Sequence, residues 1–169
     1  MANANNENIF DIIDEIRTYL QDKILTNQEL LKYLDGKSGS PLSLPDYTMD
    51  EAWSLVGDTG CIFFNPLSER TTIEQKTLLL CLFEINSSKR DYVTITLFFI
   101  IMVNNEINEL DNGSSRLLKI CRSIDDTFKK NKSNKWLGEI SLNHFRQITA
   151  PSGYQGMELS YKLTGFNWW

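Results

Sequence analysis

The chain has 169 residues, a formal charge of −5 and a pI near 4.9, with 41% hydrophobic and 11% aromatic residues. A chain of this size buries roughly 70% of its unfolded surface, so we expect one folded domain with its own core. The acidic balance argues against a dedicated nucleic-acid binder, because neutralising phosphates requires clustered Lys and Arg.

The N-terminus has neither the basic start nor the long apolar core of a signal peptide, and no window approaches the roughly 20 apolar residues of a membrane span. The three cysteines, Cys61, Cys81 and Cys121, are odd in number and widely spaced. This usage indicates reduced, buried thiols in a cytosolic setting. We expect no membrane segment and no disulfide framework.

Residues 1–36 are predicted to form an N-terminal helical hairpin. Apolar residues recur at helical spacing from Ile9 to Ile24, with acidic residues between them. The run Thr26-Asn27-Gln28-Glu29 then matches a capping box and begins a shorter helix that ends at Gly36. Because almost no loop separates the two helices, we expect them to fold back on each other.

Residues 37–60 are interpreted as a loop or docking arm. Gly, Ser and Pro residues, including Pro41 and Pro45, interrupt any regular element. The stretch from Thr48 to Val56 predicts one or two helical turns inside this segment.

Residues 61–169 are predicted to form an α+β core. A short strand at Cys61–Phe64 is followed by a longer one at Leu78–Ile85. A polar turn joins the latter to the strand Tyr92–Val103, which favours an antiparallel hairpin.

The second half of this core contains one helix and two strands. The helix begins at Ser114 or Ser115 and extends to about Lys130, with Arg116 expected on its solvent side. The strands are predicted at 137–148, where the phase shift after Leu142 indicates a bulge, and at 157–164.

This order of elements is typical of an α+β domain, an antiparallel β-sheet with helices packed on one face. The single domain then divides into the helical hairpin at 1–36, the loop or arm at 37–60 and the α+β core at 61–169.

The strand Tyr92–Val103 carries the strongest pattern in the chain. Its first half alternates apolar and polar residues, as a half-buried strand does. From Phe98 onward both faces are apolar, so Phe98, Ile100 and Met102 require cover from a helix or from a neighbouring subunit. We predict that these three residues lie in a subunit interface.

The last two residues, Trp168 and Trp169, are a second interface candidate. Two tryptophans at the end of a chain are costly to leave in water, and tryptophan is enriched at interface hot spots. Either the tail folds back on its own core or it contacts another subunit, and contact with a neighbour is the interpretation we favour.

No catalytic, cofactor-binding or metal motif is present in the sequence. The single histidine, His144, has no acidic or nucleophilic neighbour at a recognised spacing, so a general base is less favoured than an ordinary strand histidine. The cysteines are too scattered for a metal site, and the acidic loop before Gly113 lacks the ligand spacing of a calcium site. A basic cluster from Lys129 to Lys135 fits a helix C-terminus, and contact with phosphate is the second interpretation.

Several stretches resemble the tail terminator or tail-completion proteins of long-tailed bacteriophages and related neck proteins. They are an N-terminal helix opening, IFDIIDEIRTYL, a long strand, YVTITLFFIIMV, a helix, RLLKICRSIDDTFKK, and a closing strand region, GYQGMELSYKLTGF. The segment at 37–60 is longer than this family leads us to expect.

The resemblance implies a non-enzymatic α+β subunit that assembles into a ring, often a hexamer, at the head–tail junction. Such a ring caps the tail tube, faces the head connector and neck proteins, and surrounds DNA only as passing cargo. It would be assembled in the host cytoplasm and end in the tail or neck of the virion.

Two other classes stay open on the residues alone. A cytosolic adaptor or regulatory domain that binds a protein partner predicts a monomer or a two-fold dimer with an exposed groove. A small enzyme whose site is assembled from scattered Asp and Glu residues and His144 predicts that replacing His144 by Ala causes a loss of function.

Overall fold

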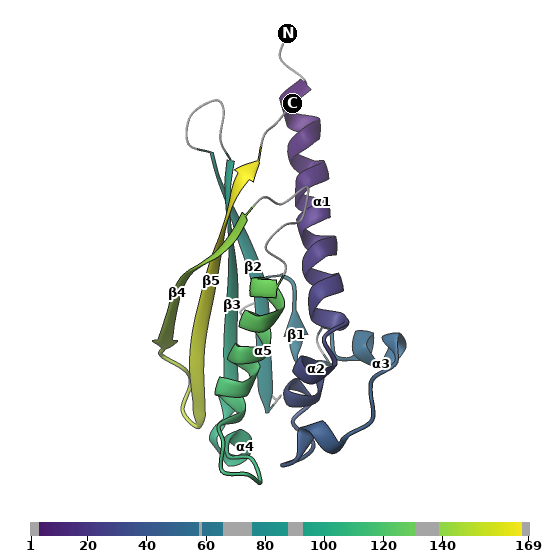
Figure 1. Cartoon of the computed structure of the whole chain (residues 1–169), viewed down its shortest axis with the longest axis vertical. Coiled ribbons are helices and arrows are strands. Elements are labelled where there is room, and N and C mark those ends of the chain that lie inside the picture. The colour runs from purple at the N-terminus through teal and green to yellow at the C-terminus, as the bar shows by residue number, and fades with distance from the viewer. Residues whose placement is uncertain (1–3, 58, 66–75, 88–92, 131–138, 167–169) are drawn as a thin grey trace.

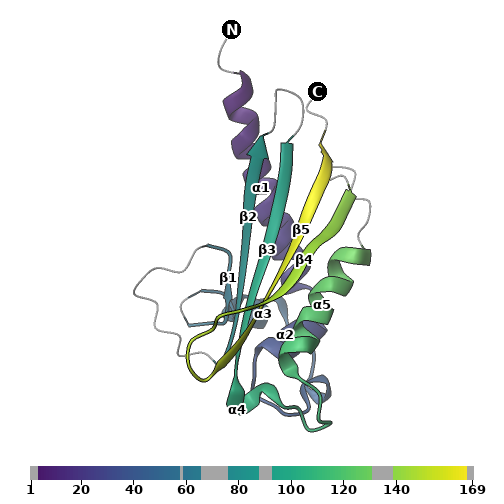
Figure 2. The ribbon, with the colours of Figure 1, turned by 90° about the vertical axis from the view of Figure 1, so that its left-hand side faces the viewer.

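The structure is a computed structural model that describes residues 4–57, 59–65, 76–87, 93–130 and 139–166. In this part of the chain a five-stranded sheet forms one layer, and the helices lie against one side of it (Figures 1 and 2). The elements in chain order are α1 (Ala4–Leu25), α2 (Gln28–Leu34), the 3₁₀ helix η1 (Pro41–Ser43), α3 (Met49–Ser54), β1 (Ile62–Phe63), β2 (Thr77–Ser87), β3 (Val93–Asn104), α4 (Asn105–Asn108), α5 (Arg116–Lys130), β4 (Glu139–Ile148) and β5 (Tyr154–Phe166).

The strands are arranged in the order β1-β2-β3-β5-β4. β1 pairs with β2 in parallel, and the other three pairings are antiparallel. The predicted α+β class with a mostly antiparallel sheet is confirmed. The predicted pairing of β2 with β3 is present, with Leu80 opposite Ile100.

The predicted bulge in β4 is also present. The register of β4 against β5 shifts between Leu142 and His144. As a result Leu142 and Phe145 both lie on the helix side of the sheet, opposite Tyr161 and Leu159. His144 therefore lies on the other side of the sheet.

The core forms where the helices meet the sheet. Phe99 of β3 packs on Phe128 of α5 with ring centroids 4.9 Å apart, and Phe128 packs on Tyr161 of β5 at 5.5 Å. Aromatic pairs of this kind contribute about 1 kcal/mol beyond the burial of their area. The alternation predicted for β3 continues along the strand, whose helix-facing residues Ile95, Leu97, Phe99, Ile101 and Val103 are all fully buried.

The two N-terminal helices are present, but a helical hairpin is not clearly formed. α2 lies at the end of α1 rather than alongside it (Figure 1). The helix cap is also one residue later than predicted: Asn27 Oδ1 accepts from the Leu30 amide at 3.0 Å, while Thr26 Oγ1 donates back to the Asp22 carbonyl. The same Asn27 side chain donates to Thr127 Oγ1 of α5 at 2.6 Å, so the cap also ties α2 to α5.

The segment at 37–60 contains η1 and α3, so the predicted helical turns are present. Thr48 and Glu51 form a capping box at the start of α3. Near α2, the segment is fixed by the ion pair between Lys32 and Asp46, whose charged atoms are 2.6 Å apart.

Arg116 was expected on the solvent side of α5, and that expectation is wrong. The side chain is 1% exposed and donates to three backbone carbonyls. Its Nε lies 2.9 Å from the Ile107 oxygen, its Nη1 3.0 Å from that of Tyr33 and its Nη2 2.5 Å from that of Ser38. A helical period alone does not reveal this role, because the partners are carbonyls of distant segments.

Candidate functional site

The side of the sheet that faces away from the helices carries a row of apolar side chains, and we call this side the open face. Leu78 and Leu80 of β2 and Phe63 of β1 form its buried part. Four apolar side chains next to them are partly exposed and form what we call the apolar stripe, which consists of Leu82, Phe98, Ile100 and Met102.

The structure brings three of the predicted interface residues together in this stripe. Phe98, Ile100 and Met102 alternate along β3 on the open face, opposite Leu82 and two other leucines of β2. The described helices lie on the other side of the sheet and do not cover them (Figure 2). Contact of this stripe with another subunit stays a prediction. Trp168 and Trp169 lie outside the described residues.

A polar border runs beside the stripe on β5 and β4. Glu158 of β5 lies between Ile100 of β3 and Arg146 of β4 in the sheet register. His144 Nε2 lies 2.5 Å from Glu158 Oε1, and Arg146 Nη2 lies 3.0 Å from Oε2. The Glu158 side chain is only 10% exposed, whereas that of Arg146 is 64% exposed. A buried carboxylate therefore has two partners that reach toward solvent.

These partners determine the charge of Glu158. Burial alone would raise the pKa of this carboxyl, but hydrogen bonds from His144 and Arg146 and the positive charge of Arg146 outweigh it. The pKa of Glu158 accordingly lies below its ordinary value. Glu158 is ionised at neutral pH and its charge is matched within the sheet.

His144, Glu158 and Ser160 have the composition of a catalytic triad but not its accessibility. Ser160 Oγ lies 2.9 Å from His144 Nδ1, the ring nitrogen that does not contact Glu158. In the tautomer whose Nε2–H donates to Glu158, the His144 Nδ1 atom accepts a hydrogen bond from the Ser160 hydroxyl. Ser160 is 0% exposed, and Asn143 Nδ2 also donates to its Oγ at 3.1 Å. A substrate has no path to this hydroxyl, so the arrangement is a polar network and not an activated nucleophile.

Sequence reasoning missed the partners of His144. They are distant in the chain and become neighbours only through the β4–β5 register. The signal was available, because folding the hairpin about Ser152 places His144 opposite Ser160 and Arg146 opposite Glu158. The predicted turn after Ile148 was therefore enough to find this network.

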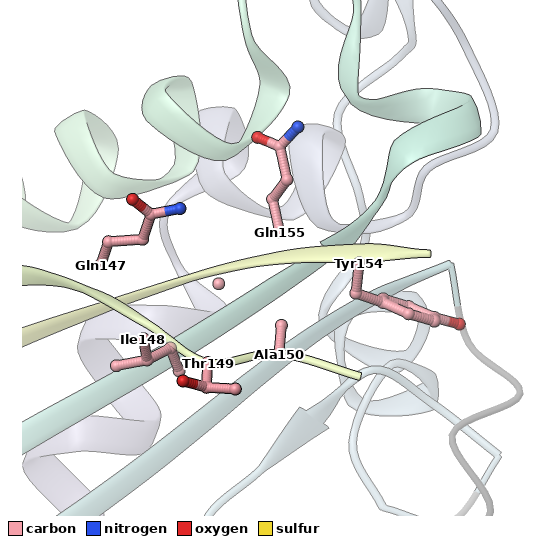
Figure 3. A pocket seen from close by; sticks show the side chains of 7 residues that line it. Gln147, Ile148, Thr149, Ala150, Tyr154 and Gln155 are labelled. Atoms are coloured by element: carbon pink, nitrogen blue, oxygen red, sulfur yellow. The ribbon is translucent and has the colours of Figure 1, made fainter. Parts of the chain in front are cut away.

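An open hollow lies at the turn end of the β4–β5 hairpin. Figure 3 shows Gln147 and Gln155 on one side of the hairpin, and Ile148 and Thr149 on the other. The residues that line it contain no carboxylate, histidine or cysteine: Gln147, Ile148, Thr149, Ala150, Tyr154, Gln155 and Gly156. Thr149 and Tyr154 supply hydroxyl groups, but the lining holds no charged side chain that could activate a nucleophile or bind a metal ion.

Within the described ranges, no group of three or more His, Cys, Asp and Glu side chains is placed to hold a metal ion. The three cysteines are free and buried, as predicted. Burial raises the pKa of the Cys61 thiol to about 11 and that of Cys121 to about 12, and it raises the pKa of Cys81 as well. These thiols behave as small buried hydrophobic groups.

One member of each charged cluster singled out from the sequence has a structural partner. Asp111 of the acidic loop accepts a hydrogen bond of 2.5 Å from Ser40 Oγ. Lys129 forms an ion pair with Asp125 one helical turn earlier. Lys132 and Lys135 lie outside the described residues.

Among the helices that the structure describes, none is both long and apolar enough to cross a membrane. Fold and open face together define an α+β protein with a partly exposed apolar sheet surface.

The sequence model of the YomW family matches residues 27–163, which is well over half of the chain. The chain belongs to the YomW family, which is phage-associated. No curated protein matches the chain. This match supports a phage origin, which is the broader part of the resemblance that the sequence suggested.

Proposed function

We propose that this protein is a virion structural subunit of a phage, a tail terminator or neck protein that assembles into a ring at the head–tail junction. The ring caps the tail tube. Its subunits are non-enzymatic and bind copies of themselves, the tail tube protein and the head connector or neck proteins. DNA passes through the lumen of the ring as cargo.

The observation that carries this proposal is the apolar stripe on the open face. Burying a side chain of the size of Phe98, Ile100 or Met102 contributes roughly 1.5–3 kcal/mol. Part of that free energy is unused while these side chains are partly exposed, and contact with a second protein surface would release it. The phage-associated family and the sequence resemblance to terminator proteins support a ring as the resulting assembly.

The proposal predicts that purified protein binds the open end of phage tail tubes. Tubes of the parent phage, assembled without this protein, are incubated with it and imaged by negative-stain electron microscopy. The expected result is a ring-shaped cap at one end of each tube, with mass measurement giving a whole number of subunits. A protein that stays monomeric at high concentration and leaves the tube ends bare would contradict the proposal.

A further inference from the structure

The segment at 37–60 presents a second apolar surface, on α3. Met49 is 52% exposed and Trp53 is 44% exposed, although both are large hydrophobic side chains. They are four residues apart and therefore share one face of the helix. Ala52 of the same helix is 1% exposed and anchors α3 to the body of the protein.

This surface is fixed before any partner binds. The Thr48 hydroxyl oxygen accepts from the Glu51 amide, and the Glu51 carboxylate accepts from the Thr48 amide at 2.8 Å. At the other end, the amides of Cys61 and Ile62 both donate to the Leu55 carbonyl, at 2.8 and 2.9 Å. A preorganised tryptophan loses little conformational freedom on binding, which favours its use as an anchor.

The charges beside α3 and beside the apolar stripe are complementary. Asp50 and Glu51 are exposed in the first turn of α3. Lys162 is exposed on the β4–β5 border of the open face, beside Arg146, whose charge is paired with Glu158. Glu84, an exposed acid on the same face, lies on β2, across β3 from that border.

The two surfaces also lie on opposite sides of the molecule. Figure 1 shows β4 at the left edge and α3 at the right edge, and in Figure 2 α3 lies behind the strands. One copy therefore cannot bring its own α3 onto its own open face. Two different patches on opposite sides are what a head-to-tail contact requires, and such contacts close into rings when the rotation between copies permits.

We propose that α3 of one copy docks on the apolar stripe of the next copy, with Met49 and Trp53 against Ile100 and its neighbours and with Asp50 toward Lys162 of the polar border. This inference rests on the proposed ring and names the surface that closes it. It also gives the segment at 37–60 a role, as the docking arm of the subunit.

The test is a mixing experiment with two variants that each damage one patch. Trp53→Glu removes the anchor, and Ile100→Glu places a carboxylate in the stripe. The account predicts that neither variant forms rings alone, and that an equimolar mixture forms a one-to-one dimer, because the intact α3 of Ile100→Glu fits the intact stripe of Trp53→Glu. Masses are measured by sedimentation velocity, and circular dichroism confirms that both variants are folded.

Leu42→Glu is the matched control, because Leu42 is 59% exposed on η1, outside the proposed contact. This variant is expected to assemble as the wild type does. If wild type forms rings and Trp53→Glu forms them equally well, docking by α3 is overturned while the ring itself stands. If wild type never assembles, the proposed function fails as well.

Disulfide trapping gives a second readout that does not depend on weakening the contact. A double variant with Trp53→Cys and Ile100→Cys should form a ladder of linked copies under oxidation, whereas either single variant should not. The native thiols are buried, so they do not compete. Crosslinking of Ile100→Cys to itself would indicate a two-fold contact between stripes and would overturn the proposal.

Discussion

At the scale of single residues, the protein stabilises the buried charges of Arg116 and Glu158 in two different ways. Arg116 donates to three backbone carbonyls, from the end of α2, from the segment after it and from α4. Glu158 accepts from two side chains of the neighbouring strand. An unpaired buried charge is costly, so each of these two side chains has partners on other segments of the chain. Through these partners each charge links segments that are separated in sequence.

Replacing Arg116 by Met should destabilise the fold strongly. The apolar side chain fits the space but leaves three carbonyls without their donor, which we expect to cost about 2–4 kcal/mol. Arg122→Met on the exposed side of the same helix is the control and should change stability by less than about 0.5 kcal/mol. Urea unfolding followed by circular dichroism measures both, and equal values for the two variants would show that Arg116 has no such role.

The pKa of Glu158 predicts a pH dependence of stability. A carboxyl whose folded pKa is lowered stabilises the fold above its unfolded pKa, near about 4.3, and this contribution is lost as pH falls through the folded pKa. Wild type should therefore lose stability below about pH 4.3 more steeply than Glu158→Gln does. Thermal unfolding between neutral and acidic pH measures the difference. Parallel curves for the two proteins would exclude a lowered pKa at Glu158.

At the scale of elements, the sequence revealed the periodic burial along strands and helices. It did not reveal most contacts between side chains of different segments. The alternation in β3, the helical period of α5 and the phase shift at Leu142 each report on local burial, so they predicted a strand, a helix and a bulge. The cap at Asn27, the burial of Arg116 and the network around His144 depend on contacts with distant segments. Of these three features, only the network around His144 could have been predicted, because the symmetry of the β4–β5 hairpin places its members opposite one another.

The buried cysteines lie beside or within β1, β2 and α5, so their reactivity reports on the core that these elements form. With the pKa of Cys61 raised to about 11, roughly one thiol in a thousand is ionised at about pH 8. We expect no labelling by iodoacetamide in the native protein and three adducts in denaturant, detected by mass spectrometry. Rapid native labelling of any of the three would contradict their burial.

At the scale of the whole molecule, the sheet has one face covered by helices and one face partly exposed. The need of Phe98, Ile100 and Met102 for cover was predicted from β3 alone, since both its faces become apolar there. The position of the cover was not predictable, because it depends on which side the helices occupy. The structure places the helices on the other side, and the open face then becomes the surface from which assembly is proposed.

The most direct test of this account is the mass of the protein across a concentration series, compared between wild type, Ile100→Glu and Leu118→Glu. Leu118 is 55% exposed on α5, away from the open face, so it controls for the chemistry of the substitution. The account predicts that wild type and Leu118→Glu form rings, whereas Ile100→Glu requires concentrations on the order of 100-fold higher, because its carboxylate would be buried at the contact. Rings that form equally well with Ile100→Glu, or a wild type that stays monomeric throughout, would contradict it.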